Sequence, residues 1–189
     1  MEIGQEIEVF SWFRIHFIEN NGMAFGIELF GKLFLSIFRI IAIGYLFYFI
    51  NNMLKKKVKT VIHIAFSLIL AGAIGNMIDS MFYGVVFNDS FGQVSTFLPE
   101  SGGYAPFLYG RVVDMLYFPI WKGFLPEWIP FIGGNYEIFF KPVFNLADSA
   151  ISIGVVFLVL YNKSLSLAFQ PVTKAPESKS AENTNNTLA

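Results

Sequence analysis

Residues 60–80 read TVIHIAFSLILAGAIGNMIDS, and this stretch decides the fold class. It contains no lysine or arginine, and its one carboxylate, Asp79, lies next to its end. A helix needs about 20 apolar residues to cross the hydrocarbon layer of a bilayer. The stretch is therefore predicted to be a transmembrane helix.

Two other stretches, 33–50 and 143–162, have the same character. We therefore predict a polytopic α-helical membrane protein with three spanning helices and an extracytoplasmic part that contains short β-strands. The composition agrees, because 54% of the 189 residues are hydrophobic, 14% are charged, and the mean hydropathy is +0.55. Membrane lipids are thus expected partners. The net charge of −1 argues against a nucleic-acid partner, which would require a basic surface.

Four lysines in the connection between the first two helices orient the chain: Lys55, Lys56, Lys57 and Lys59. Short loops rich in lysine and arginine stay in the cytoplasm. We therefore divide the chain into an outer strand and turn segment (1–32), a membrane domain (33–162) with an outer loop (81–142), and a cytoplasmic tail (163–189). The end of this tail is rich in Ser, Asn and Thr, so the tail is expected to be disordered.

The two outer regions have patterns of their own. Apolar and polar residues alternate from Trp12 to Ile18, as in a half-buried strand. Asn20, Asn21 and Gly22 then favour a turn. The long outer loop is interrupted by proline and glycine, and we expect short strands and interfacial aromatic segments around 104–131.

One short pattern, Asn-x-x-Asp-Ser, occurs twice. It places Asn76 and Asp79 near the end of the second helix, and Asn145 and Asp148 near the start of the third. At about 1.5 Å per residue, Asp79 lies about 28 Å and Asp148 about 21 Å from the inner edge. Ionisable groups at such depth are costly and indicate a functional site. The alternative is that both pairs only join the helices by hydrogen bonds.

A third acidic candidate is Asp114, which lies in the apolar run Val112-Val113-Asp114-Met115 of the outer loop. A solvated loop acid usually has polar neighbours, so this setting favours a functional role over an ordinary surface role. The sequence lacks the residues that other common catalytic chemistries require. The chain has no cysteine, no His-Glu-x-x-His motif and no glycine-rich nucleotide loop. We therefore expect carboxylate chemistry without a metal or another cofactor.

These residues also carry a family resemblance. In this order, four segments resemble the four sequence blocks of bacterial lipoprotein signal peptidase (signal peptidase II): NNGMAF at 20–25, GAIGNMID at 72–79, VVD at 112–114 and FNLAD at 144–148. The resemblance covers roughly residues 8–162. It implies a multi-pass aspartic endopeptidase of the bacterial inner membrane, with its active site near the extracytoplasmic face. Such an enzyme removes the signal peptide from diacylglyceryl-modified prolipoproteins and cleaves just before the lipidated Cys.

The resemblance also implies roles for particular residues. Asp114 and Asp148 match the catalytic aspartates. The positions that match supporting polar residues, expected to orient the site or the substrate, are Asn20, Gly22, Asn76, Asp79 and Asn145.

The chain departs from the family pattern in three places. The outer loop is longer than usual. The usual first spanning helix does not occur between Met1 and the first predicted span, so we expect it ahead of Met1 or from a neighbouring element. Ser80 stands where the family commonly has Arg. Arg39 or Arg111 could replace that cation, although Arg39 is expected to extend toward the lipid headgroups instead.

A function of a different class also accounts for part of the pattern. In a small ion- or proton-coupled transporter subunit, Asp79 and Asp148 would carry protons or bind cations within the membrane. This alternative leaves Asp114 unexplained.

Overall fold

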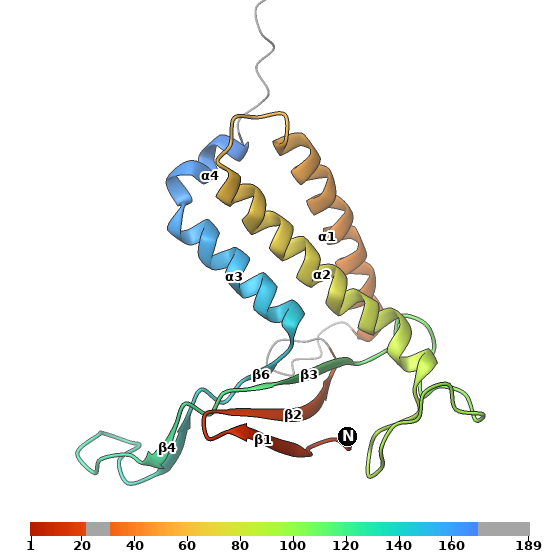
Figure 1. The fold of residues 1–189 in the computed structure, drawn as a ribbon, viewed down its shortest axis with the longest axis vertical. Coiled ribbons are helices and arrows are strands. Elements are labelled where there is room, and N and C mark those ends of the chain that lie inside the picture. Colours follow the sequence, from red (N-terminus) through yellow and green to blue (C-terminus); the bar gives the residue numbers. More distant parts are fainter. Residues whose placement is uncertain (22–30, 170–189) are drawn as a thin grey trace, which may run out of the picture.

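The computed structural model describes residues 1–21 and 31–169. Helices α1 (Lys32–Met53), α2 (Thr60–Val86) and α3 (Leu146–Leu160) form a bundle, and a β-sheet lies across one end of it (Figure 1). The short helix α4 (Asn162–Phe169) lies at the other end. The connection between α1 and α2, which contains the lysine cluster, is at the α4 end.

Among the described residues, α1 and α2 are each long and apolar enough to cross a membrane. A third span requires α3 and α4 together, and these two helices are bent by 95° relative to each other. The 15 residues of α3 extend only about 22 Å, at about 1.5 Å per residue. The fold is therefore that of a polytopic helical membrane protein with two clear spans and up to three.

The helices differ from the predicted ranges at their ends. α2 continues six residues beyond Ser80, because residues 81–86 are apolar and contain no proline; it ends where Phe87 takes an extended backbone. α3 begins at Leu146 and not at 143, because Val143 and Phe144 pair with a neighbouring strand. Capping by Asn145 then fixes the start of the helix.

The predicted disordered tail begins with structure. Residues 163–169 belong to α4, where Ser164 and Ala168 are buried. Ala168 packs with Met53, Ile62 and Phe66 in the main apolar cluster of the molecule. This burial explains why the segment is helical. Residues 170–189 lie outside the described part of the chain.

Helices α2 and α3 approach each other closely because glycines face the neighbouring backbone. A Cβ atom on Gly72 would lie 2.2 Å from the carbonyl oxygen of Ala147. A Cβ atom on Gly154 would lie 2.6 Å from the carbonyl oxygen of Ala65. Small residues permit this kind of packing between membrane helices. Any larger side chain at Gly72 would push α3 away from α2.

The main sheet is antiparallel and has the strand order β1-β2-β3-β6. Its strands are β1 (Glu6–Phe10), β2 (Phe13–Asn20), β3 (Val112–Tyr117) and β6 (Val143–Phe144). The alternating segment that begins at Trp12 forms most of β2, whereas β1 was not expected. A separate hairpin consists of β4 (Trp121–Phe124) and β5 (Tyr136–Phe139).

The register of the main sheet brings distant segments of the chain together. Ile18 pairs with Asp114, and Asn20 pairs with Val112. On the other side of β3, Leu116 pairs with Phe144, the residue before Asn145. The sheet therefore joins the end of β2, the middle of β3 and the start of α3.

Candidate active site

Asp148 lies in the first turn of α3, where it forms a reciprocal cap with Asn145. The Asn145 Oδ1 atom accepts a hydrogen bond of 2.9 Å from the Asp148 backbone N–H. The Asn145 backbone N–H donates to Asp148 Oδ2 at 3.4 Å. The partial positive charge of a helix N-terminus favours a carboxylate here. The Asn-x-x-Asp spacing of this segment is thus the spacing of a helix cap.

The same spacing in α2 has a different role, because it lies within the helix. Asn76 Nδ2 donates a 2.7 Å hydrogen bond to Asp148 Oδ1, across the interface between α2 and α3. Asn76 Oδ1 accepts a hydrogen bond of 3.0 Å from Asn145 Nδ2. Asn76 therefore fixes the orientation of both polar residues at the start of α3.

Asp114 approaches this pair from the sheet. Its side chain is buried, with the residue only 4% exposed. Asn145 Nδ2 donates to Asp114 Oδ1 at 2.9 Å, and Asn20 Nδ2 donates to Asp114 Oδ2 at 3.2 Å. Asn145 thus contacts Asp148 with its backbone N–H and side-chain oxygen, and contacts Asp114 with its side-chain nitrogen.

The surroundings of Asp114 favour its protonated form. Burial raises the pKa of Asp114 to about 6, against the opposing effect of the hydrogen bonds from Asn20 and Asn145. The nearby carboxylates of Asp148 and Asp79 raise this pKa further. Carboxylates that interact in this way share a proton, because they resist ionising together. The site can therefore retain a proton up to a pH of about 6, where a free aspartate would already be ionised.

Asp79 has a more peripheral position. Its Oδ2 atom accepts a hydrogen bond of 3.4 Å from the backbone N–H of Val113, next to Asp114. The carboxylate of Asp79 therefore connects α2 to β3 and helps to place Asp114 over α3.

Arg39 does not extend toward the headgroups as expected. Its Nη1 atom donates a 3.2 Å hydrogen bond to the Oγ atom of Ser80, which is fully buried. Ser80 Oγ in turn donates to the backbone oxygen of Asn76 at 3.1 Å. The guanidinium is also close enough to Asp148 for their charges to interact. The cation is drawn inward because buried polar groups need partners.

Arg111, the other candidate for the missing cation, lies elsewhere. Its Nη1 atom pairs with Glu19 at 2.8 Å and with Asp89 at 3.5 Å, and its guanidinium lies over the ring of Tyr104. Glu19 also accepts a hydrogen bond from Ser90. Arg111 therefore fastens β2 to the outer loop, and its described ion pairs do not include the site aspartates.

The site opens into a cavity of about 320 Å³ between α2, β3 and the start of α3. Its lining residues are Gly75, Asn76, Asp79, Met115, Leu116, Asn145, Leu146 and Ala147. The space has the size of a small ligand site, for which volumes of roughly 300–1,000 Å³ are typical. A substrate segment in this cavity would lie against the polar residues of the site.

Of the predicted site residues, Gly22 lies outside the described residues. The sequence does not indicate Glu19 and Ser90, which hold the end of β2 in place. Glu19 directly precedes Asn20, but a glutamate at the end of a strand carries no pattern that would indicate a buried ion pair. Ser80 belongs to the recurring Asn-x-x-Asp-Ser pattern and departs from the family pattern, but neither feature indicates its hydrogen bond to Arg39.

Comparisons with known proteins identify relatives of this chain. The family model described as signal peptidase (SPase) II matches residues 1–163. A lipoprotein signal peptidase of Porphyromonas gingivalis is 51% identical over 179 residues, which cover 94% of this chain and 79% of the relative. One of Amoebophilus asiaticus is 40% identical and is aligned over 91% of this chain and 70% of its own.

A solved structure is similar as well. A chain described as a bacterial membrane enzyme superposes with a TM-score of 0.53 at 28% sequence identity. The alignment covers 92% of this chain and 80% of that structure. With the family match over most of its length, the chain belongs to the signal peptidase II family.

Proposed function

We propose that Asp114 and Asp148 are the catalytic pair of this aspartic endopeptidase, which removes signal peptides from prolipoproteins. We further propose that the substrate carries a diacylglyceryl group and that the cleaved bond lies just before the lipidated Cys. The observation that carries the proposal is the contact of Asn145 with both carboxylates. One residue thereby links two acids that come from the sheet and from α3.

The chemistry needs one proton on the pair. Asp114, whose pKa is raised to about 6, is proposed to hold this proton, and Asp148 is proposed to be ionised. Asp148 accepts a proton from a water molecule as the water oxygen bonds to the scissile carbonyl carbon. Asp114 donates a hydrogen bond to the carbonyl oxygen, where negative charge develops. When the C–N bond breaks, a proton passes from the pair to the leaving amine of the Cys.

The neutral amides are proposed to be positioning residues. Asn20, Asn76 and Asn145 donate hydrogen bonds to the two carboxylates and hold them without changing the charge of the pair. Asp79 is proposed to position β3 through the Val113 backbone. Gly22 keeps the supporting role that the family resemblance implies.

Arg39 is proposed to replace the cation that the family commonly has at position 80. Its hydrogen bond to Ser80 brings a guanidinium from α1 to the place on α2 where that side chain would begin. From there its positive charge is close enough to Asp148 to interact with that carboxylate. Arg111 is proposed to act only indirectly, through the placement of β2.

The placement in the membrane follows from charge. We propose that the protein lies in the bacterial inner membrane, with the lysine cluster between α1 and α2 in the cytoplasm. The carboxylates, at the opposite end of the bundle, then lie near the extracytoplasmic face. In this placement α3 with α4 completes a third span, and the cleavage site of a membrane-spanning signal helix reaches the pair.

The decisive test is cleavage of a lipid-modified prolipoprotein by the purified protein in detergent. Asp114→Asn and Asp148→Asn should each abolish cleavage, because either change removes one carboxyl group of the proton-sharing pair while nearly preserving volume. The double variant should be little worse than either single variant, since residues that act as a unit are not additive. Asn76→Ala should leave reduced but measurable turnover. Near-normal processing by Asp114→Asn would instead make Asp79 the partner of Asp148.

The transporter alternative is not favoured. The chain belongs to a peptidase family, and Asp114 joins the same network as Asp148. A transporter would have no evident use for a third carboxylate supplied by a sheet outside the helices.

A further inference from the structure

The hairpin of β4 and β5, with its loop 125–135, carries an unusual number of exposed apolar side chains. Those at least 40% exposed are Trp121, Phe124, Trp128, Phe131, Ile132, Tyr136 and Phe139, and the flanking Ile120 and Phe140 are similarly exposed. The largest exposures are those of Trp128 at 80% and of Phe131, which is fully exposed. A surface of this kind is typical of an interaction site.

The hairpin also lacks a partner within the described part of the chain. Its two strands form a sheet of their own, and the hairpin extends sideways beyond the helix bundle (Figure 1). An isolated two-stranded hairpin is marginally stable in water. Its loop is nevertheless closed by backbone hydrogen bonds, from Gly134 to Leu125 at 3.0 Å and from Gly133 to Ile129 at 3.0 Å. The exposed side chains are therefore presented by an organised loop.

The exposed Phe131 has an unfavourable backbone conformation. Its φ of 68° lies in the left-handed region, which bulky residues rarely adopt. Such strain persists where the surroundings or a function require it. Packing within the molecule does not compensate for it, because the side chain is fully exposed.

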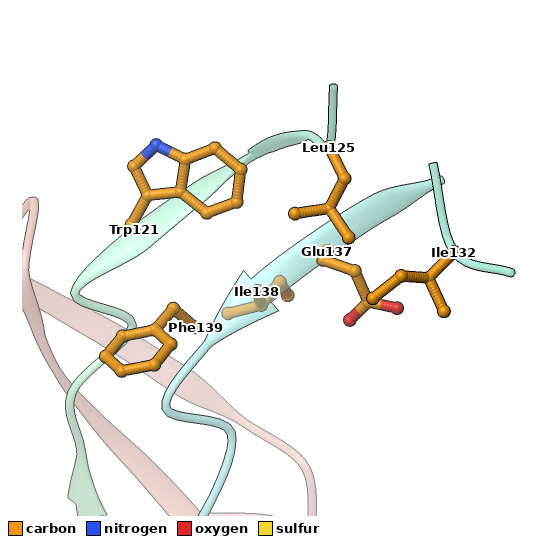
Figure 2. Close-up of a pocket in the computed structure, with 6 residues that line it drawn as sticks. All are labelled: Trp121, Leu125, Ile132, Glu137, Ile138 and Phe139. Carbon is orange, nitrogen blue, oxygen red and sulfur yellow. The ribbon is translucent and has the colours of Figure 1, made fainter. Parts of the chain in front are cut away.

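The hairpin and its loop border an open, shallow cavity of about 450 Å³ (Figure 2). Trp121 and Phe139 flank one end of it, and Leu125 and Ile132 flank the other. The acidic lining residue, Glu137, forms a 2.5 Å ion pair with Lys141. The lining is therefore suited to a flexible hydrocarbon chain with a polar group at the edge.

We propose that this hairpin enters the bilayer surface beside α3 and that its cavity holds an acyl chain of a membrane phospholipid. The hairpin lies close to α3 in the chain, and this closeness favours the bilayer as the partner of its apolar surface. β5 ends at Phe139, seven residues before α3 begins, so its end lies within about 25 Å of the helix that enters the membrane. The hairpin carries Trp121, Trp128 and Tyr136, and tryptophan and tyrosine are the residue types that gather at headgroup level. This inference does not depend on the proposed catalytic pair.

The test uses the full chain in vesicles of phosphatidylcholine and phosphatidylglycerol. Trp12→Phe and Trp121→Phe leave Trp128 as the single tryptophan. Phospholipid brominated near the top of its acyl chains should quench about half of the Trp128 emission, because an interfacial indole lies within reach of the bromine atoms. Acrylamide, which stays in water, should quench it weakly.

Two further substitutions make the test specific. Phe131→Asp should bring Trp128 into water, with less quenching by brominated lipid and more by acrylamide, whereas Phe131→Leu should not. Neither variant should unfold at a lower temperature than the parent in detergent, because the Phe131 side chain is fully exposed and its replacement leaves no cavity. Three results would overturn the proposal: quenching by acrylamide alone, an equal response of the two variants, or quenching by lipid only after a prolipoprotein is added. The last result would assign the surface to the substrate.

Discussion

The two ends of α2 are stabilised in opposite ways. Near its start, Ile62 and Phe66 pack into an apolar cluster with Met53 and Ala168. Near its end, Asn76 belongs to a network of amides and carboxylates that joins α2 to α3 and the sheet. The apolar end gains free energy from close packing, whereas the polar end must first offset the cost of burying charge. The difference indicates that the polar end is retained for chemistry and the apolar end for stability.

The largest expected effect concerns the apolar end. Ile62→Ala should lower the free energy of unfolding by about 2–5 kcal/mol, because the side chain is fully buried and its loss leaves a cavity. Turnover per folded molecule should stay unchanged, since this cluster lies at the far end of α2 from the carboxylates. Denaturation in detergent, with cleavage normalised to folded protein, measures both quantities. A fall in normalised turnover would show that the two ends are coupled.

Asp114→Asn should have a smaller effect, of opposite sign, on stability. Because burial raises the pKa of Asp114 to about 6, the folded protein holds a proton that the unfolded chain has already lost. Stability of the parent protein therefore falls as the pH rises from about 4 to about 6 and stays lower above it. The variant lacks this loss. Its stability relative to the parent should rise by about 3 kcal/mol across the window, at about 1.4 kcal/mol per pKa unit.

Unfolding of both proteins at pH 4 and pH 8, in the same detergent, measures this difference. Asn145→Ala is the matched comparison, because it removes a donor from Asp114 and keeps the carboxylate. A stability difference between Asp114→Asn and the parent that does not change with pH would contradict the raised pKa. An inactive variant that is more stable at neutral pH would show directly that the site costs stability.

Much of the fold follows from periodicity and hydropathy. The apolar stretches predict α1 and α2, which are each long enough to cross a membrane, and the alternation from Trp12 predicts β2. The start of α3 was predicted too early, because apolar residues of a strand and of a helix look alike when the period is short. Pairing of Phe144 with β3 depends on residues about 30 positions away, and local sequence does not encode it.

The candidate site could be predicted in part for a similar reason. Recurrence of Asn-x-x-Asp indicates that Asn76 and Asn145 belong to the site. It does not reveal that one segment is a helix cap and that the other lies within a helix. Depth counting places Asp148 and Asp79 close together. The sheet register, which the sequence does not specify, is what adds Asp114 and Asn20 to this group. The sequence allows two directions for Arg39 and favours the headgroups; the inward direction depends on its hydrogen bond to the buried Ser80.

The smallest expected effect concerns Arg39, and it tests how far the polar end extends into α1. Arg39→Ser should lower kcat/KM about tenfold, a loss of about 1.4 kcal/mol, because Asp148 loses the cation with which its charge interacts. The acidic limb of the pH profile should move to higher pH. A purely structural role of Arg39 would leave that limb in place.

Exchange of the two side chains sharpens the test. Arg39→Ser combined with Ser80→Arg returns the cation from α2, in the place where the family commonly has it, and uses the space that Arg39 vacated. This double variant should recover most of the lost kcat/KM and restore the limb. Ser80→Arg alone should have a lower kcat/KM than the parent. Two guanidinium groups would then be buried side by side in a space that holds Arg39 and a serine. If the double variant is no better than Arg39→Ser, the cation at this position does not act on Asp148, and the polar end of the molecule is confined to α2, α3 and the sheet.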